Sequence, residues 1–223
     1  MAWANMRNMC GRRNFYAAIV GAFAAFAAFA QPVAAAGPLL EAVKAGDTTN
    51  ARALLAERAD ANEADADGTT ALHWAVHGDD VELASLLLAA GANVAATNRY
   101  GVAPLYLASE NGNAQMVRAL LEHGADPNTA LPEGETALMT AARTGNVATL
   151  EALLMAGANP NAREGWKGQT ALMWAAAENN ATAAKTLLDA GAERDAVSAG
   201  GELTAFTFAV RHGAIETTRA LLD

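Results

Sequence analysis

One nine-residue pattern recurs along this chain at nearly constant intervals. Its best copies begin at Gly68, Gly101, Gly134 and Gly168 and read GTTALHWAV, GVAPLYLAS, GETALMTAA and GQTALMWAA. A looser copy, ELTAFTFAV, begins at Glu202, and a degraded first copy begins near Pro38. The third residues of the five clear copies are 33, 33, 34 and 34 positions apart. Such a period is the signature of a solenoid of stacked units, and it predicts a binding scaffold rather than an active site.

Each unit reads as two helices joined by a turn. In the copy at Gly68, Thr70 can cap a first helix that begins at Ala71, and Gly78–Asp80 breaks that helix. Residues 81–90 then have a leucine-rich face typical of a second helix, and Gly91 follows where a left-handed C-cap residue is needed. The sequence therefore predicts an all-α solenoid of about six helix-turn-helix units joined by β-hairpin-like loops.

The units resemble those of the ankyrin repeat family. The shared motifs are Gly-x-Thr-(Ala/Pro)-Leu at the start, Leu-Leu in the second helix and Gly-Ala-(Asn/Asp)-x-Asn at the end. The units lie near 37–67, 68–100, 101–133, 134–167, 168–201 and 202–223, the last incomplete. The family's His after the Leu remains only at His73, and Tyr106, Met139, Met173 and Thr207 replace it. These replacements put the family's hydrogen bonding between repeats in question but not the fold.

The two ends of the repeat array differ from its middle. The first unit carries the charged side chains expected of a solenoid cap: Lys44, Arg52, Glu57 and Arg58, the last where later units have their terminal Gly. The last unit keeps the apolar pattern of an internal repeat and stops at Asp223, inside its second helix. We therefore expect either further repeats after it, or self-association or a partner that covers this end.

Residues 1–36 have the three parts of a secretory signal peptide. A basic start with Arg12 and Arg13 and no acid precedes the apolar run 16–30, and small residues at 34–36 suit a signal peptidase. The run is shorter than the roughly 20 residues that span a bilayer, so a cleaved leader is favoured over an anchor. Arg12-Arg13-Asn14-Phe15 also resembles the bacterial twin-arginine motif, so both the general secretory route and the twin-arginine route stay open. Either route predicts a periplasmic or secreted protein.

Charge and cysteine content narrow the range of partners. All 24 acidic residues but only 12 of the 15 basic residues follow the leader, so the net charge changes from −9 to −12 when the leader is removed. This acidity disfavours nucleic acid and, after leader cleavage, membrane surfaces as partners. A basic or neutral protein partner remains compatible. Cys10 is the one cysteine and lies in the leader, so the mature chain has no thiol chemistry.

Two short patterns suggest metal binding, and both are weak. Residues 63–68 match the start of a calcium loop, but the twelfth position, where a Glu is needed, is Trp74. His73 and His77 are four residues apart on one helix, yet no third ligand is obvious and His73 has the place of the family's structural histidine. No nucleophile triad or phosphate-binding glycine loop is found. We expect no metal, no cofactor, no catalytic residue and no enzymatic activity.

The resemblance implies that the hairpin tips and the concave side of the first helices bind a partner protein. Trp166 is the sharpest candidate, because an exposed tryptophan at a projecting turn is a typical binding anchor, although it could instead fold onto its neighbouring hairpin. The predicted partner-binding residues are Asp67, His77, Arg99, Tyr100, Glu110, Asn111, Glu133, Arg143, Trp166, Lys167 and Glu178. The alternative is that the repeats form the N-terminal binding domain of a larger exported enzyme or cofactor protein.

Overall fold

A computed structural model describes residues 37–201 and 203–222, so the predicted leader lies outside the described residues. The described residues form twelve helices: α2 (Pro38–Lys44), α3 (Thr48–Ala56), α4 (Ala71–His77), α5 (Val81–Ala89), α6 (Pro104–Asn111), α7 (Ala114–Glu122), α8 (Ala137–Thr144), α9 (Val147–Met155), α10 (Ala171–Ala177), α11 (Ala181–Asp189), α12 (Ala205–His212) and α13 (Ile215–Leu222). In this part of the chain no strand forms, and no helix is long and apolar enough to cross a membrane.

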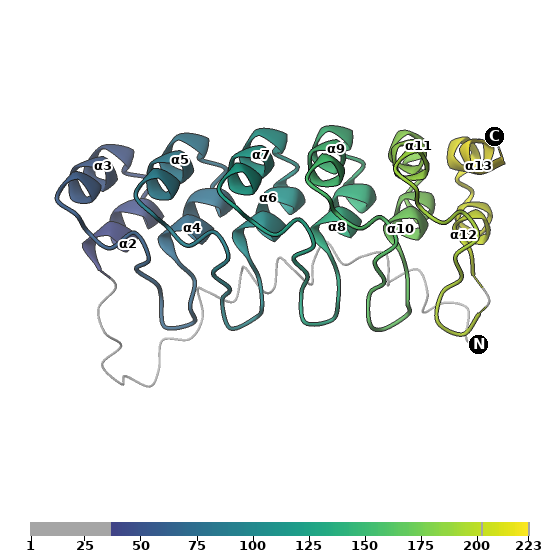
Figure 1. Ribbon diagram of the computed structural model, residues 1–223, viewed down its shortest axis with the longest axis horizontal. Coiled ribbons are helices and arrows are strands. Elements are labelled where there is room, and N and C mark those ends of the chain that lie inside the picture. Colours follow the sequence, from purple (N-terminus) through teal and green to yellow (C-terminus); the bar gives the residue numbers. More distant parts are fainter. Residues whose placement is uncertain (1–36, 202, 223) are drawn as a thin grey trace. The chain divides into compact units, whose positions relative to one another are not determined.

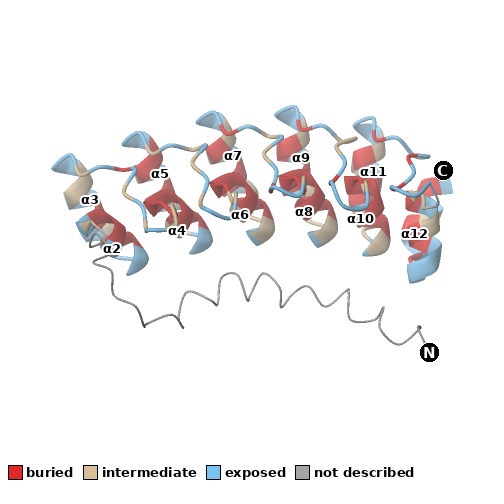
Figure 2. Ribbon diagram, turned by 90° about the horizontal axis from the view of Figure 1, so that it is seen from below, coloured by how far each residue is buried: buried red, intermediate tan, exposed pale blue. Residues whose placement is uncertain are grey.

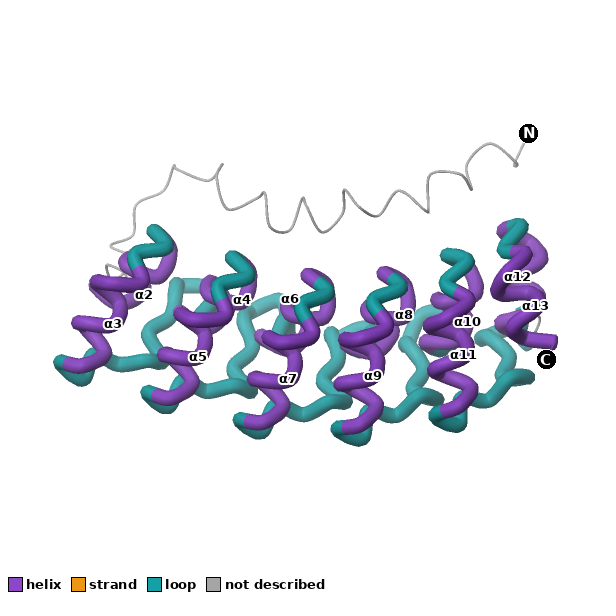
Figure 3. Tube along the Cα trace, turned by 90° about the horizontal axis from the view of Figure 1, so that it is seen from above, coloured by secondary structure: helices purple, strands orange, loops and turns teal. Residues whose placement is uncertain are grey.

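The helices form two parallel rows (Figure 1). The first helices of the units, α2, α4, α6, α8, α10 and α12, contact one another in sequence order, and the second helices, α3 to α13, do the same. Figure 3 shows each second helix beside that of the next unit. Between units, loops project beyond the row of first helices (Figure 1). This arrangement confirms the predicted all-α solenoid of helix-turn-helix units.

Side-chain caps explain where the helices begin. The Thr70 hydroxyl accepts a hydrogen bond from the backbone N–H of His73, and the equivalent threonines at 136, 170 and 204 cap their helices in the same way. Four second helices, α3, α5, α7 and α9, begin after an Asp or Asn cap, such as Asp80, whose carboxylate accepts the N–H of Leu83 at 2.9 Å. Each cap satisfies a donor that the first helical turn leaves unpaired.

Residues in the left-handed backbone conformation explain where the second helices end. Gly91 has a φ of 89°, and the equivalent Gly124, Gly157 and Gly191 have similar values. Arg58, at the same position of the first unit, adopts a φ of 66°. A side chain in this conformation costs about 1 kcal/mol. The chain keeps the repeat geometry there in spite of that strain.

The core consists mainly of leucine and alanine. Leu72, Leu105, Leu138 and Leu172 occupy one position in four units, and each is at most 1% exposed. Alanines beside them let the helices approach closely. Figure 2 shows buried residues along the middle of both rows and exposed residues at the helix ends. Because each unit lies against its neighbours, the core runs continuously along the stack.

His73 has the structural role that the resemblance implied. Its Nδ1 accepts the N–H of Thr70 at 3.1 Å, so its Nε2 carries the proton and donates to the carbonyl of Val102 in the next unit at 3.0 Å. Tyr106 replaces this histidine one unit later, and its hydroxyl donates to Glu135 in the following unit at 2.8 Å. The predicted doubt about bonding between repeats is therefore wrong at Tyr106. Met139 and Met173 contribute apolar packing instead.

A second set of bonds joins the loops of successive units. The Asn62 amide donates to the Gly91 carbonyl at 3.4 Å and accepts the Asn93 N–H at 2.7 Å. Asn128 and Asn161 make the same pair of bonds, each to the unit that follows it. These are the last asparagines of the Gly-Ala-(Asn/Asp)-x-Asn motif. The motif therefore bonds one unit to the next.

Candidate functional site

Residues at one equivalent position, the last or second-to-last residue of each first helix, form a row across the units. This helix-end row consists of Lys44, His77, Glu110, Arg143, Ala177 and Arg211. Because the positions are equivalent, the side chains follow one another along one edge of the stack. Four of the six positions have a formal charge at neutral pH, and a fifth is histidine. The row therefore varies in charge from unit to unit on a constant backbone.

Lys44, the first residue of the row, is held by contacts within the protein. The Lys44 ammonium lies 2.6 Å from the Asp65 carboxylate and 5.7 Å from the ring centre of Trp74. The Trp74 indole N–H donates to the same carboxylate at 3.0 Å. Sequence reasoning assigned Lys44 to a cap and missed this cluster, although its spacing of 33 residues from His77 was the available signal.

Glu110 occupies the middle of the row. It is half-buried at the end of α6, and no hydrogen bond or ion pair to its carboxylate forms among the described residues. Burial raises the pKa of Glu110, and the nearby Glu135 carboxylate raises it further, while Arg143 and then His77 oppose that rise. The structure thus brings together three predicted site residues, His77, Glu110 and Arg143, from three successive units.

The Arg143 side chain contacts the following unit. Its guanidinium carbon lies 5.9 Å from the ring centre of Trp174 on α10, a distance suited to a cation–π contact. Trp74 and Trp174 occupy equivalent positions, and both are half-buried and face a cation from the preceding unit. Both tryptophans therefore border the helix-end row.

The remaining residues near the helix ends differ in whether their side chains are exposed or are held within the protein. His77 and Glu178 are exposed. The Asn111 amide donates to the Val76 carbonyl of the preceding unit at 2.8 Å, so its side chain also holds two units together. Glu135 is only 7% exposed, and its carboxylate accepts hydrogen bonds from the hydroxyls of Tyr106 and Thr140.

Three pairs of neighbouring hairpin tips are linked through their backbones. The Arg99 N–H donates to the Asp67 carbonyl at 2.7 Å, and the Gly165 N–H donates to the Glu133 carbonyl at 2.6 Å. A third bond of 2.6 Å joins the N–H of Ala199 to the carbonyl of Lys167. Predicted tip residues from different units are therefore held at fixed separations.

Two aromatic side chains stand out on the tips. Trp166 is 63% exposed and Tyr100 is 37% exposed. Each has a cation from the adjacent residue over its ring: Arg99 lies 4.8 Å from the Tyr100 ring centre, and Lys167 lies 5.1 Å from the Trp166 ring centre. Both pairs consist of predicted partner-binding residues.

The hairpin that carries Trp166 is one residue longer than those before it. The bond from Leu131 N–H to Glu135 carbonyl closes a five-residue hairpin, whereas that from Glu164 N–H to Gln169 carbonyl closes a six-residue hairpin. This insertion accounts for the first 34-residue step in the sequence. The buried Glu164 carboxylate accepts the N–H groups of Trp166, Lys167 and Gln169 at 2.7, 2.7 and 3.0 Å. The buried Glu164 side chain thus fixes the backbone of this longer hairpin.

The two patterns that suggested metal binding have structural roles. Both ring nitrogens of His73 are hydrogen-bonded, and burial lowers its pKa. The Asp65 carboxylate is held by Lys44 and Trp74. No group of three His, Cys, Asp or Glu side chains that could hold a metal ion occurs in the described residues.

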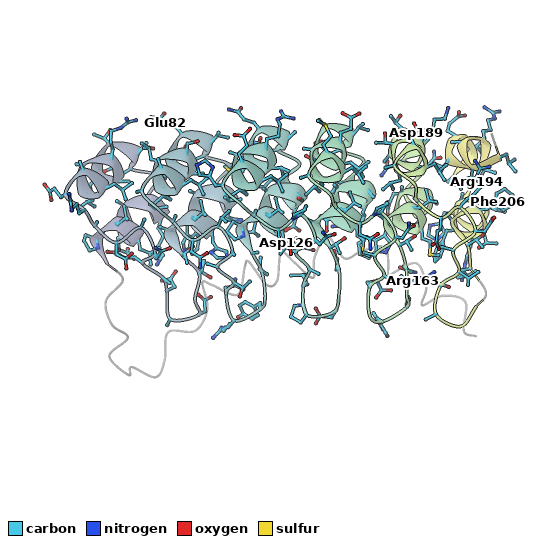
Figure 4. The ribbon with its side chains drawn as sticks, in the orientation of Figure 1. Glu82, Asp126, Arg163, Asp189, Arg194 and Phe206 are labelled. Atoms are coloured by element: carbon cyan, nitrogen blue, oxygen red, sulfur yellow. The ribbon has the colours of Figure 1, made fainter. Side chains whose placement is uncertain are left out.

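Two other surface features lie outside the helix-end row and the hairpin tips. An open hollow of about 510 Å³ is lined by Arg163, Glu193, Arg194, Asp195, Ala196 and Val197. Its two arginines, both labelled in Figure 4, are balanced by two acids, so the net charge of the hollow favours neither an anionic nor a cationic ligand.

The last unit exposes the apolar side chains of Val210, Ile215 and Leu222 at 56%, 62% and 67%, which confirms the apolar surface that the sequence predicted there. What covers it stays a prediction.

Comparison with known proteins supports the repeat assignment. The family model for ankyrin repeats, in three copies, matches residues 39–130, 98–164 and 126–198. The crystal structure of an ankyrin repeat protein superposes with a TM-score of 0.78 and 28% sequence identity, and the match covers 84% of this chain and 98% of the other. A search of curated proteins found no match.

Proposed function

Since the chain belongs to the ankyrin repeat family, whose repeats are generally scaffolds for protein–protein interaction, we propose that it is an exported scaffold that binds a partner protein. The binding surface consists of the helix-end row and the hairpin tips. Ankyrin repeats are typically not enzymes, and we propose no catalytic activity for this chain.

The observation that carries this proposal is the exposure of Trp166 on a rigid support. A tryptophan that is 63% exposed leaves a large apolar surface in water. Its hairpin is held by the Glu164 carboxylate and bonded to the neighbouring hairpin through Gly165. An aromatic side chain held in one place binds with little loss of entropy, which is the character of an anchor residue.

Export rests on the sequence of residues 1–36. A basic start, an apolar run and a small-residue cleavage site are the marks of a secretory signal. The absence of cysteine from the remaining chain suits an oxidising compartment, because no thiol can be oxidised there. Detection of the protein in the periplasmic or culture fraction, with its leader removed, tests the export proposal. Retention in the cytoplasm would contradict it.

Affinity capture from a periplasmic extract tests the binding proposal. The purified protein is the bait, and Trp166→Ala is expected to recover at least tenfold less of the partner, as for an anchor worth about 2 kcal/mol. Met155→Ala is the matched control, because Met155 is 90% exposed at the end of α9 and outside the proposed surface. Equal recovery with Trp166→Ala and the unchanged protein would remove Trp166 as an anchor.

The exposed apolar face of the last unit favours a second candidate function. In that case the same surface belongs to the N-terminal binding domain of a larger exported enzyme or cofactor protein, whose next segment covers Val210, Ile215 and Leu222. The intact mass of the protein isolated from its natural source decides between the two. A mass that matches the repeats alone would contradict this second candidate.

A further inference from the structure

Glu110 is a partly buried carboxylate to which the described residues form no hydrogen bond or ion pair. It lies at the end of α6, in the middle of the helix-end row. The described residues include other carboxylates with defined partners, such as Asp65 with Lys44 and Glu135 with Tyr106. An ionised group that loses water without gaining a hydrogen bond destabilises the folded state. The unpaired state of Glu110 therefore needs an explanation outside the fold.

Two basic side chains lie near Glu110 and do not pair with it. Arg143 and His77 are close enough to influence its titration, but neither forms an ion pair with it. Arg143 stands over the Trp174 ring instead, and the His77 ring makes an edge contact with Trp74, with ring centres 6.2 Å apart. Arg143 and His77 thus contact the two tryptophans rather than the Glu110 carboxylate.

Two carboxylates, Glu110 and Glu135, and one guanidinium, that of Arg143, act on one another at this point of the row, so its formal charge at neutral pH is negative. The carboxylate that acts on Glu110, that of Glu135, is buried and cannot turn away to solvent. The whole chain has a net charge of −9, which attracts basic partners over a distance. A positively charged side chain placed at Glu110 would restore the interactions that the carboxylate lost on burial.

We propose that the helix-end row binds a segment of a partner protein that carries a lysine or arginine, and that this side chain pairs with Glu110. The inference rests on the proposed scaffold function and specifies the chemistry of the partner. Glu110 is the anchoring carboxylate. Trp74 and Trp174, half-buried on either side of it along the row, border the bound segment.

The first test needs no identified partner. Acetyl-arginine amide is titrated into the purified protein, and backbone amide shifts at Asn111 and Gly112 are followed by NMR. We expect saturable shifts with acetyl-arginine amide and none with acetyl-citrulline amide, its uncharged analogue. Glu110→Gln should abolish the shifts, whereas Glu151→Gln, a change at an exposed position on α9, should leave them unchanged. Equal responses to the two amides would overturn the inference.

The second test uses the captured partner. Glu110→Gln should weaken its binding by about tenfold or more, as expected when one member of a desolvated charge pair is removed. Glu151→Gln should change it less than twofold. Normal binding by Glu110→Gln overturns this inference and leaves the scaffold function standing. If no partner is captured, the scaffold proposal fails, and the arginine titration alone decides whether Glu110 is a cation site.

Melting temperature separates a binding role from a structural one. If Glu110 serves binding, Glu110→Gln should melt at the same temperature as the unchanged protein or higher at pH 7, because the amide loses less on burial than the carboxylate. A clearly lower melting temperature would show that the carboxylate stabilises the fold, and would overturn the inference.

Discussion

At the scale of single residues, His73 shows how one side chain can hold two units together. Its imidazole accepts a hydrogen bond from the Thr70 N–H of its own unit and donates one to the Val102 carbonyl of the next. Only the neutral ring can do both, because the protonated ring has no acceptor. Burial lowers the pKa of His73 and so keeps the ring in this form.

This residue should make stability depend on pH. The unfolded chain protonates His73 near pH 6.5, while the folded chain resists protonation to a lower pH. The stabilisation is therefore complete above about pH 6.5 and is lost as pH falls from there toward the folded-state pKa. Urea unfolding between pH 7.5 and 5.5 should show a steeper loss of stability in the unchanged protein than in His73→Gln. His77→Gln, the matched control, should keep the steep loss. Parallel curves for the unchanged protein and His73→Gln would contradict this account.

At the scale of the element, the asparagines at the end of the repeat motif join the loop of one unit to the loop of the next by hydrogen bonds. Two units lack the asparagine, because Ala95 and Asp195 stand at the position of Asn62, Asn128 and Asn161. The junction between the units of α5 and α7 therefore lacks the pair of bonds that Asn62, Asn128 and Asn161 make at three other junctions.

Ala95→Asn should supply these bonds. By analogy with Asn128, the new amide would donate to the Gly124 carbonyl and accept the Asp126 N–H. Ala95 is exposed, so nothing has to be displaced. Two added hydrogen bonds at a partly solvated site should raise the free energy of unfolding by about 1 kcal/mol. Chemical denaturation measures this, with Ala95→Gln as the control whose longer side chain cannot repeat the geometry. A loss of stability with Asn would show that this junction differs from the others.

How far sequence predicts structure also differs by element. The period and the caps at Thr70 and Asp80 placed the helices, and the observed α5 ends at Ala89 where the pattern had indicated 90. These features depend on residues a few positions apart. The buried state of Glu135 and the Lys44–Asp65 pair depend on side chains from different units, whose partners a repeat pattern does not specify.

At the scale of the molecule, the described repeats behave as a one-dimensional array. Contacts between helices lie within a unit or between adjoining units, so each unit is stabilised by its own packing and by one or two neighbours. The units at the ends have a neighbour on one side only among the described residues. A substitution that destabilises one unit should therefore also destabilise its neighbours, and the effect should become smaller with distance along the array.

The same substitution should then act differently in the middle and at the end. Leu138 in α8 and Leu221 in α13 are both buried, at 1% and 3% exposure. Replacing either with Ala removes about 2–5 kcal/mol of packing locally. Leu221→Ala should speed hydrogen exchange in α12 and α13 and leave α4–α9 protected. Leu138→Ala should speed exchange in α6–α11, because the unit it weakens supports two others. Exchange followed by mass spectrometry resolves these regions. If both variants lost protection uniformly from α2 to α13, the repeats would unfold as a single cooperative unit rather than as an array of neighbours.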